Sequence, residues 1–413
     1  MRPDPSRGNL LNRRLIVFLA AMVLAELSRT MTMIQIPVYL RELGASIQQI
    51  GFFFTISLGF PLLLRIFGGW ISDTVGRLPA LIVGSAVGVL TYIAYMLAPN
   101  WQIALLGPAI LAISSALIFP SYKSYIADQA SEEVRGRVFG IAEAVVSMAW
   151  IIGPPVGGYI AQNLSYRLMF LAAAITFGLA MLIFFFLHRT STEREIFAVQ
   201  KPSIVNLRSS FRSMFLLMIS GGLVTWILIV DGVRDIAFKM SFDLMPIYLK
   251  EIALFTKQEI GFLDGLFGVA LAVTTIPAGW LVDKVSERLG ITLGILTMII
   301  SRLLFAVSLS FTGFAFSWIL LGIGGGLIDP AGSALIAKGV PKRIRGLAYG
   351  LIATSLGIFS LPAPWIGSQV WNFVSPRAPF LLTVVLGTIV IIPAWKKLVV
   401  KPKYWVGVEV KVP

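Results

Sequence analysis

Long apolar segments follow one another along almost the whole chain, and only short polar segments separate them. A helix needs roughly 20 mostly apolar residues to cross the hydrocarbon core of a bilayer. With 57% hydrophobic residues, 13% charged residues and a mean hydropathy of +0.86, the chain needs lipid as its solvent. We therefore predict an all-α membrane protein of 12 transmembrane helices, near residues 12–40, 47–72, 78–98, 101–127, 136–162, 166–188, 213–250, 257–283, 289–312, 313–339, 343–372 and 377–400.

The basic residues are distributed unevenly between alternate loops. Twenty-three lysines and arginines lie in the loops on the side of the two termini, and five lie in the other loops. Because positively charged loops tend to stay inside the cell, we expect both termini in the cytoplasm of a multi-pass protein of the cell (plasma) membrane. The net charge of +14 comes from these scattered loops, so nucleic acid is not an expected partner.

The sequence lacks the residues that several kinds of protein function need. The chain has no cysteine for a disulfide or a thiolate metal site and only one histidine, and it has no glycine-rich Walker sequence for ATP. No nucleophile, base and acid gather at the end of a span. We expect neither an enzyme nor a protein that binds a cofactor or a metal.

The two halves of the chain repeat each other at a shift of about 210 residues. Matching positions include Gly69/Gly279, Trp70/Trp280, Asp73/Asp283, Pro120/Pro330, Arg135/Arg345, Gly140/Gly350, Pro154/Pro364 and Gly157/Gly367. Thr256 and Glu259 form a capping box that predicts the start of helix 8, as Ser46 and Gln49 do for helix 2. We predict two six-helix bundles in pseudo-twofold, parallel repeat, at 1–188 and 213–413, joined by a cytoplasmic linker at 189–212.

Charged residues inside the spans are the candidates for function, because a charge in the bilayer is costly. Helix 1 carries Glu26 and Arg29 one turn apart, and helix 7 carries a stripe of charges at the same spacing (Asp231, Arg234, Asp235 and Lys239). The repeat matches Glu26 with Asp235, and either carboxylate could carry a proton. The alternative is internal neutralisation, in which these charges form only structural ion pairs.

Other charged residues of the predicted spans do not form such a stripe along one helix. Arg65 and Asp329 lie about two turns from the predicted cytoplasmic ends of their helices, where they could line a cavity. Glu143, Asp243 and Asp264 are the remaining acids.

Two motifs stand out, one in the loop after helix 2 and one on helix 5. The first comprises Gly69, Asp73, Gly76 and Arg77, with Asp128 and Arg135 further on, and the second comprises Gly140, Gly153, Pro154, Gly157 and Gly158. The first resembles the signature of the major facilitator superfamily and the second resembles its antiporter motif, and the resemblance covers residues 12–400. The loop motif is degraded in the second half, where Ser286 replaces the glycine at position 76. Helix 4 has Gly107-Pro108 where many proton-coupled exporters have an arginine.

The resemblance implies how these motifs act. Asp73 and Arg77, with Asp128, are expected to lock the cytoplasmic side shut, although Arg77 could serve only as an anchor at the lipid headgroups. The glycines of helix 5 are expected to form a smooth ridge that slides against the other half, or else to serve ordinary helix packing. Helices 1 and 7 are expected to line a central cavity. Arg302, on the peripheral helix 9, is expected to have either a structural role or a role at the lipid-facing edge, and not to contact substrate.

The expected function is secondary active transport by alternating access. The helix 5 motif favours proton-coupled export of amphiphilic small molecules or drugs by a monomer. The missing arginine of helix 4 favours a proton-coupled symporter or a uniporter of a sugar or another small metabolite. A non-transporting membrane receptor is the alternative from another class.

Overall fold

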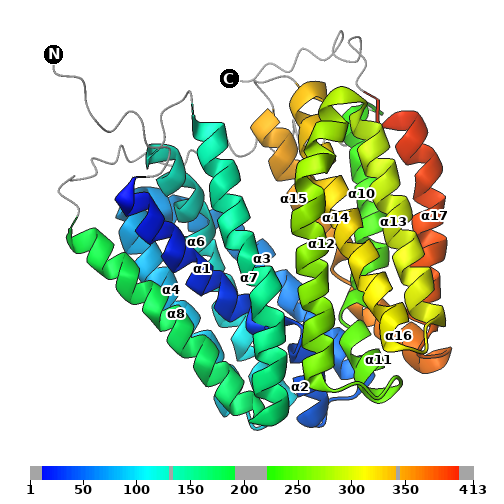
Figure 1. Cartoon of the computed structure of the whole chain (residues 1–413), viewed down its shortest axis with the longest axis horizontal. Helices are drawn as coiled ribbons and strands as arrows, with labels where there is room; N and C mark the ends of the chain where they lie inside the picture. The colour runs from blue at the N-terminus through cyan, green and yellow to red at the C-terminus, as the bar shows by residue number, and fades with distance from the viewer. Residues whose placement is uncertain (1–11, 130–133, 191–220, 341–344, 400–413) are drawn as a thin grey trace. The chain divides into compact units, whose positions relative to one another are not determined.

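The computed structural model describes residues 12–129, 134–190, 221–340 and 345–399, and all the regular structure in these ranges is helical (Figure 1). Nine helices in the described ranges are long and apolar enough to cross a membrane. The other three predicted spans are α3 (Ile47–Val75) and the spans predicted at 213–250 and 343–372. Each of the last two contains two helices in the structure. The predicted class, an all-α membrane protein of two repeated halves, is confirmed.

The helices of the two repeats occur in the same order. The first repeat contains α1 (Arg13–Met33), α2 (Ile36–Glu42), α3, α4 (Arg77–Leu97), α5 (Trp101–Ala104), α6 (Leu106–Gln129), α7 (Arg135–Asn163) and α8 (Tyr166–Arg189). The second contains α10 (Leu223–Phe242), α11 (Met245–Glu251), α12 (Lys257–Lys284), α13 (Glu287–Val307), α14 (Phe311–Gly339), α15 (Arg345–Ser360), α16 (Ala363–Phe373) and α17 (Ala378–Lys397).

The first helix of each repeat breaks near the same position. Helix α1 ends before Pro37, which lies in the first turn of α2, and α10 ends before Pro246, which lies in α11. Proline has no backbone N–H to donate to the carbonyl four residues earlier, so it ends the preceding helix. Because the two repeats carry this proline at matching positions, their first helices end at matching positions. The capping box that starts α12 is also present: Glu259 accepts a hydrogen bond from Thr256 N at 2.8 Å.

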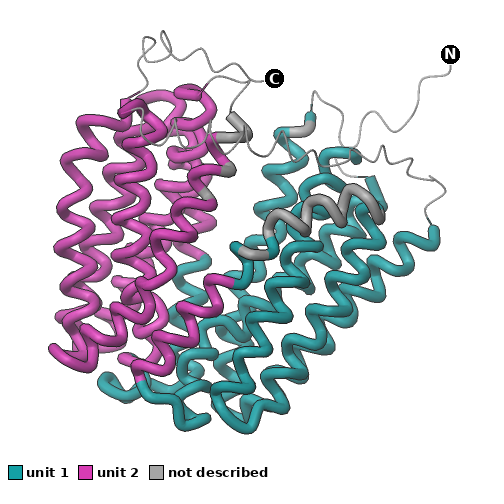
Figure 2. Tube along the Cα trace, turned by 180° about the vertical axis from the view of Figure 1, so that it is seen from behind, with its two compact units in different colours: residues 1–46, 60–199, 249–268 teal, residues 47–59, 200–248, 269–413 magenta. Residues whose placement is uncertain are grey.

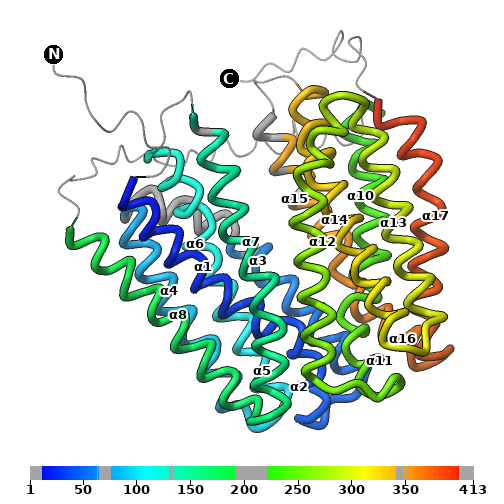
Figure 3. Tube along the Cα trace, in the orientation of Figure 1, coloured from blue at the N-terminus to red at the C-terminus, as the bar shows by residue number. Residues whose placement is uncertain are grey.

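The packing scheme repeats as well. Helix α1 packs against α7 and α8, and α4 packs against α6 and α8 (Figure 3). In the second repeat, α10 packs against α15, α16 and α17, and α13 packs against α14 and α17. Helices that match in sequence between the two repeats therefore have matching neighbours.

The chain forms two compact units whose boundaries differ from those of the repeats. Unit 1 comprises residues 1–46, 60–199 and 249–268, and unit 2 comprises residues 47–59, 200–248 and 269–413 (Figure 2). The first part of α3 thus belongs to unit 2, and the first part of α12 belongs to unit 1. The predicted linker at 189–212 lies outside the described residues from 191 onward.

Apolar side chains cover both the inside and the outside of the helices. On α8, Phe177 and Phe184 are buried, whereas Ile175, Leu179 and Phe186 on other faces are each about half exposed or more. Because a helix that is apolar all round needs apolar surroundings, this outer face fits lipid tails.

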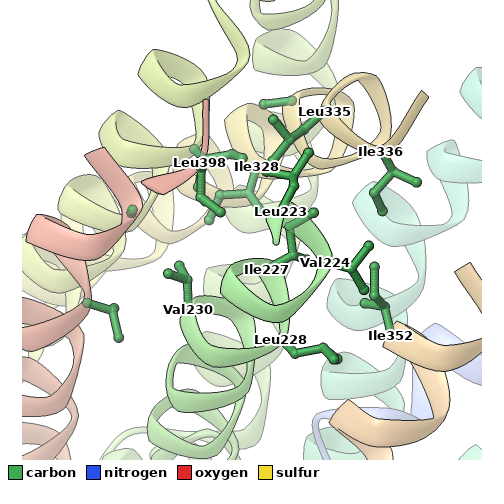
Figure 4. Packing of buried hydrophobic residues seen from close by; sticks show 14 of the residues in the cluster. Leu223, Val224, Ile227, Leu228, Val230, Ile328, Leu335, Ile336, Ile352 and Leu398 are labelled. Carbon is green, nitrogen blue, oxygen red and sulfur yellow. The ribbon is translucent and has the colours of Figure 1, made fainter. Parts of the chain in front are cut away.

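Unit 2 contains a buried aliphatic cluster. Its members include residues of α10, α14, α15 and the chain after α17, among them Leu223, Val224, Ile227, Ile328, Leu335, Ile352 and Leu398 (Figure 4).

Candidate functional site

Glu26 and Arg29 form a two-point ion pair on α1. Arg29 Nε donates a hydrogen bond to Glu26 Oε2 at 3.1 Å, and Arg29 Nη2 donates to Glu26 Oε1. The guanidinium carbon also lies 4.9 Å from the centre of the Trp150 ring on α7. A bidentate, charge-assisted pair stacked on an indole is a strong arrangement for a partly buried charge. The carboxylate of Glu26 is therefore neutralised from its own helix.

A cavity of about 410 Å³ lies beside this pair, within unit 1. Its walls come from α1, α4, α6, α7 and α8. The charged lining residues are Glu26, Arg29 and Glu143, and the hydroxyl groups come from Tyr92, Ser114, Ser115 and Tyr122. The remaining lining is apolar: Met22, Ala25, Leu111, Ile118, Phe119, Val146 and Phe177. A largely apolar cavity of this size with a few polar groups is typical of a site for a drug-sized molecule.

Glu143 is the charged lining residue of this cavity that was not among the predicted site residues. It lies on α7, and the electrostatic neighbours of Tyr122 include both Glu143 and Glu26. With these two acids and Arg29, the lining carries a formal charge of −1. The only signal in the sequence was a charge inside an apolar span, and the rotation of α7 about its axis decides that this charge faces the cavity.

The charges of α10 form two separate ion pairs in unit 2. Arg234 Nη1 lies 2.9 Å from Asp231 Oδ1, and Lys239 Nζ lies 2.7 Å from Asp235 Oδ2. Lys239 also donates a hydrogen bond to Ser360 Oγ at the end of α15, at 2.8 Å. The partner of Asp235 in the structure is therefore Lys239, and Arg234 pairs with Asp231.

Of the two deeper charges predicted to line a cavity, the structure describes the side chain of Asp329 but not that of Arg65. Asp329 on α14 has Arg234 and Asp231 as its electrostatic neighbours, so it belongs to the charge cluster of unit 2. The side chain of Arg65 lies outside the described set. Glu26 belongs to unit 1 and Asp235 to unit 2. That helices 1 and 7 face one cavity stays a prediction.

The described part of the loop motif lies at the start of α4. Gly76 is the residue before α4 and has a φ of 106°, which side chains disfavour. Its repeat match, Ser286, is extended and caps α13 with its side chain, so a serine suffices there. Arg77 Nε lies 3.5 Å from Asp128 Oδ2, and that this pair locks the cytoplasmic side stays a prediction. For Gly69, Asp73 and Arg135 the structure describes only the helical backbone.

The helix 5 glycines contact two different helices. At Gly153 and Gly157, a side chain would overlap Thr30 and Met31 of α1, in the same repeat. At Gly158, a Cβ atom would lie 2.5 Å from the carbonyl of Lys257, in the second repeat. The carbonyl of Pro154 faces Gly261 in the same way, and a Cβ at Gly140 would meet no atom within 4 Å. Within unit 1, Gly158 is thus the glycine of the motif that packs on the other repeat.

Arg302 is buried, which fits the structural role that was one of the two expectations and does not fit a lipid-facing edge. It is 0% exposed, and its guanidinium lies 5.1 Å from the centre of the Phe238 ring on α10. None of its three guanidinium nitrogens has a hydrogen-bond partner among the described residues. Its role therefore concerns the stability of the fold.

Proteins with similar sequences carry names that refer to multidrug resistance. A multi-drug resistance efflux pump PmrA homolog of Lactococcus lactis subsp. lactis is 25% identical over 363 residues, which cover 84% of this chain and 85% of that protein. The multidrug resistance protein MdtG of Yersinia enterocolitica is 24% identical over 364 residues, covering 85% and 84%.

Solved transporters share the fold. A POT family transporter in complex with 5-aminolevulinic acid superimposes with a TM-score of 0.75 at 13% identity, covering 92% of this chain and 94% of that one. A peptide transporter POT in complex with sulfate gives 0.74 at 13%, covering 92% and 93%. The sequence model of the Major Facilitator Superfamily matches residues 18–242 and 232–409. The chain therefore belongs to the Major Facilitator Superfamily and is a multi-pass transporter of the plasma membrane.

Proposed function

We propose that this chain is a secondary active transporter that exports amphiphilic small molecules, lipophilic cations above all, in exchange for protons. The observation that carries the proposal is the cavity of unit 1, in which Glu26 and Glu143 outnumber the single base Arg29. Aromatic and aliphatic walls take up the apolar part of a substrate, and the excess carboxylate takes up its positive charge. The names of the similar proteins support export.

Proton exchange follows from competition for Glu26. Burial favours the neutral carboxyl, whereas a nearby cation favours the carboxylate. The carboxyl group of Glu26 can therefore pair with Arg29, bind a proton or pair with a cationic substrate. A change in the burial of Glu26 or in its distance from Arg29 decides which of the three it binds. A proton that binds from outside displaces the substrate, and a substrate that binds from inside displaces the proton. Each chain carries its own cavity, so the working unit is a monomer.

Asp235 is the matching group of the second repeat. It is neutralised by Lys239, one turn further on, whereas Glu26 is neutralised by Arg29. Lysine gives up a proton or a partner more readily than a bidentate arginine does. The two matched acids therefore differ in how firmly their partners hold them, and Asp235 serves as the second proton site.

Transport in liposomes tests the proposal with tetraphenylphosphonium as the probe. Wild-type protein should accumulate the probe when a pH gradient is imposed and should also exchange it at equilibrium. Glu26→Gln and Asp235→Asn should lose gradient-driven uptake and retain exchange, because exchange needs no net proton movement. The matched control is Glu287→Gln, which breaks an ion pair with Lys338 far along the sequence from the cavity residues.

Other outcomes would contradict the proposal in different ways. Full gradient-driven uptake by both variants would remove Glu26 and Asp235 as coupling residues. Wild-type transport of a sugar or an amino acid, but not of tetraphenylphosphonium, would favour the symporter or uniporter. Binding of the probe without any flux would favour a receptor.

A further inference from the structure

We propose that Trp150 is a positioning residue that makes the Glu26–Arg29 ion pair depend on the contact between α7 and α12. Trp150 touches Arg29 on one side and the first part of α12 on the other. The inference rests on the proposed function, because it concerns the ion pair that is proposed to couple protons to transport.

The first contact holds Arg29 in place. The Trp150 ring lies 4.9 Å from the guanidinium carbon of Arg29, which at the same time donates its hydrogen bonds to Glu26. Thr30 Oγ1 donates a hydrogen bond to the carbonyl of Ala149 at 2.8 Å, immediately before Trp150. This bond fixes α1 and α7 to each other at the height of the stack. The indole therefore favours the position in which Arg29 neutralises Glu26.

The second contact reaches the other repeat and lies wholly within unit 1. The ring of Trp150 lies 6.1 Å from that of Phe267 on α12, at an interplanar angle of 61°. A Cβ at Gly268 would lie 2.6 Å from the carbonyl oxygen of Trp150, so only glycine permits this approach. A Cβ at Gly265 would lie 2.7 Å from Cγ of Pro155. A shift of α12 along α7 must therefore move the surroundings of the indole.

The second repeat contains a matching arrangement. The position 210 residues after Trp150 is Ser360, whose hydroxyl accepts a hydrogen bond from Lys239 at 2.8 Å. Lys239 is the cation that neutralises Asp235, the match of Glu26. In both repeats, the same position thus holds the cation that neutralises the acid of the first helix. The chemistry differs, since one is an indole face and the other a hydroxyl.

The consequence concerns proton binding at Glu26. Its titratable surroundings are Arg29 on its own helix, Tyr92 on α4, Tyr122 on α6 and Glu143 on α7. Among these only Arg29 is a cation, so loosening Arg29 favours protonation of Glu26. When α12 withdraws, Trp150 is released, Arg29 loses its stacking partner and Glu26 takes up a proton.

Chemical labelling of Glu26 tests this without any transport. Dicyclohexylcarbodiimide reacts with protonated carboxyl groups in an apolar environment, and mass spectrometry can follow the peptide that contains Glu26 as the pH is varied. Trp150→Leu should move the labelling midpoint upward by as much as about one pH unit, equivalent to about tenfold. Trp150→Phe, which retains a ring, should shift it less, and Phe267→Leu should shift it slightly in the same direction.

Glu143 is the internal control, because it lies in the same cavity but about two helical turns from Trp150 along α7. An unchanged midpoint for Glu26, or an equal shift of Glu143, would overturn the proposal. Thermal unfolding of each variant checks folding, and Trp150→Phe is the variant to rely on if Trp150→Leu unfolds. Since labelling needs no substrate, a failure here is distinct from a failure of tetraphenylphosphonium transport, which would count against the proposed function.

Discussion

Lys257 Nζ lies 2.7 Å from Glu42 Oε1 and 4.0 Å from the centre of the Tyr166 ring. The pair connects the end of α2, in the first repeat, with the start of α12, in the second. Gln35 reinforces it by donating a hydrogen bond to the carbonyl of Lys257 at 2.9 Å. We call these four residues the α2–α12 latch, and all belong to unit 1.

The first prediction is that breaking this latch favours the state in which α2 and α12 separate. Glu42 is about half exposed, so its ion pair is weak, and the stacking of Lys257 on Tyr166 adds to it. Lys257→Gln should raise the accessibility of a cysteine at Gln162 to an impermeant maleimide by about threefold to tenfold. The chain has no cysteine of its own, so this reporter needs no background changes. Exchanging the two charges in the double variant Lys257→Glu, Glu42→Lys should restore low labelling. Labelling that is the same in Lys257→Gln as with Lys257 in place would argue against a latch.

The second prediction separates the glycines of α7 by the helix that each one contacts. Gly157→Ala should lower thermal stability because the new methyl group overlaps the backbone of Met31 in the same repeat. Gly158→Ala should impair turnover more than stability, since it meets the carbonyl of Lys257 on α12. Gly140→Ala is the control, with no atom in reach, and should be neutral or stabilise by up to about 1 kcal/mol. Normal turnover in Gly158→Ala would mean that the α7–α12 contact does not move during transport.

The third prediction concerns the loop motif before α4. Asp73→Asn should leave expression intact and reduce transport by about tenfold, equivalent to roughly 1.4 kcal/mol of stabilisation of one end state. Asp128→Asn should cost less, because Asp128 is 58% exposed and its ion pair with Arg77 is screened by water. Flux through reconstituted protein, corrected for the amount inserted, distinguishes the two. Wild-type flux in Asp73→Asn would contradict the lock.

The fourth prediction is that Arg302 destabilises the fold. A buried charge without a hydrogen-bond partner costs more than an apolar side chain of similar size. Arg302→Met should therefore raise the stability by about 1–4 kcal/mol, seen as a higher midpoint of thermal unfolding in detergent. Phe238→Leu, which removes only the ring beneath the guanidinium, should lower it. A lower midpoint in Arg302→Met would show that the guanidinium has a stabilising role.

Spacing along the helices made the charge pairing predictable. Glu26 and Arg29 are three residues apart on one helix, and helix geometry alone brings such residues together. The same rule accounts for the pairs on α10, because Arg234 lies three residues after Asp231 and Lys239 lies four residues after Asp235. Adjacent residues such as Arg234 and Asp235 do not face each other on a helix, so they do not pair.

The sequence by itself determined the helical class, the repeat, the breaks before Pro37 and Pro246 and the membrane as solvent, because these depend on local periodicity and composition. Only the tertiary structure decided that Glu143 enters the cavity, that Trp150 stacks on Arg29 and that Gly158 meets α12. These contacts depend on the rotation and tilt of whole helices. Where both faces of a helix are apolar, the pattern of the sequence does not reveal which face turns inward.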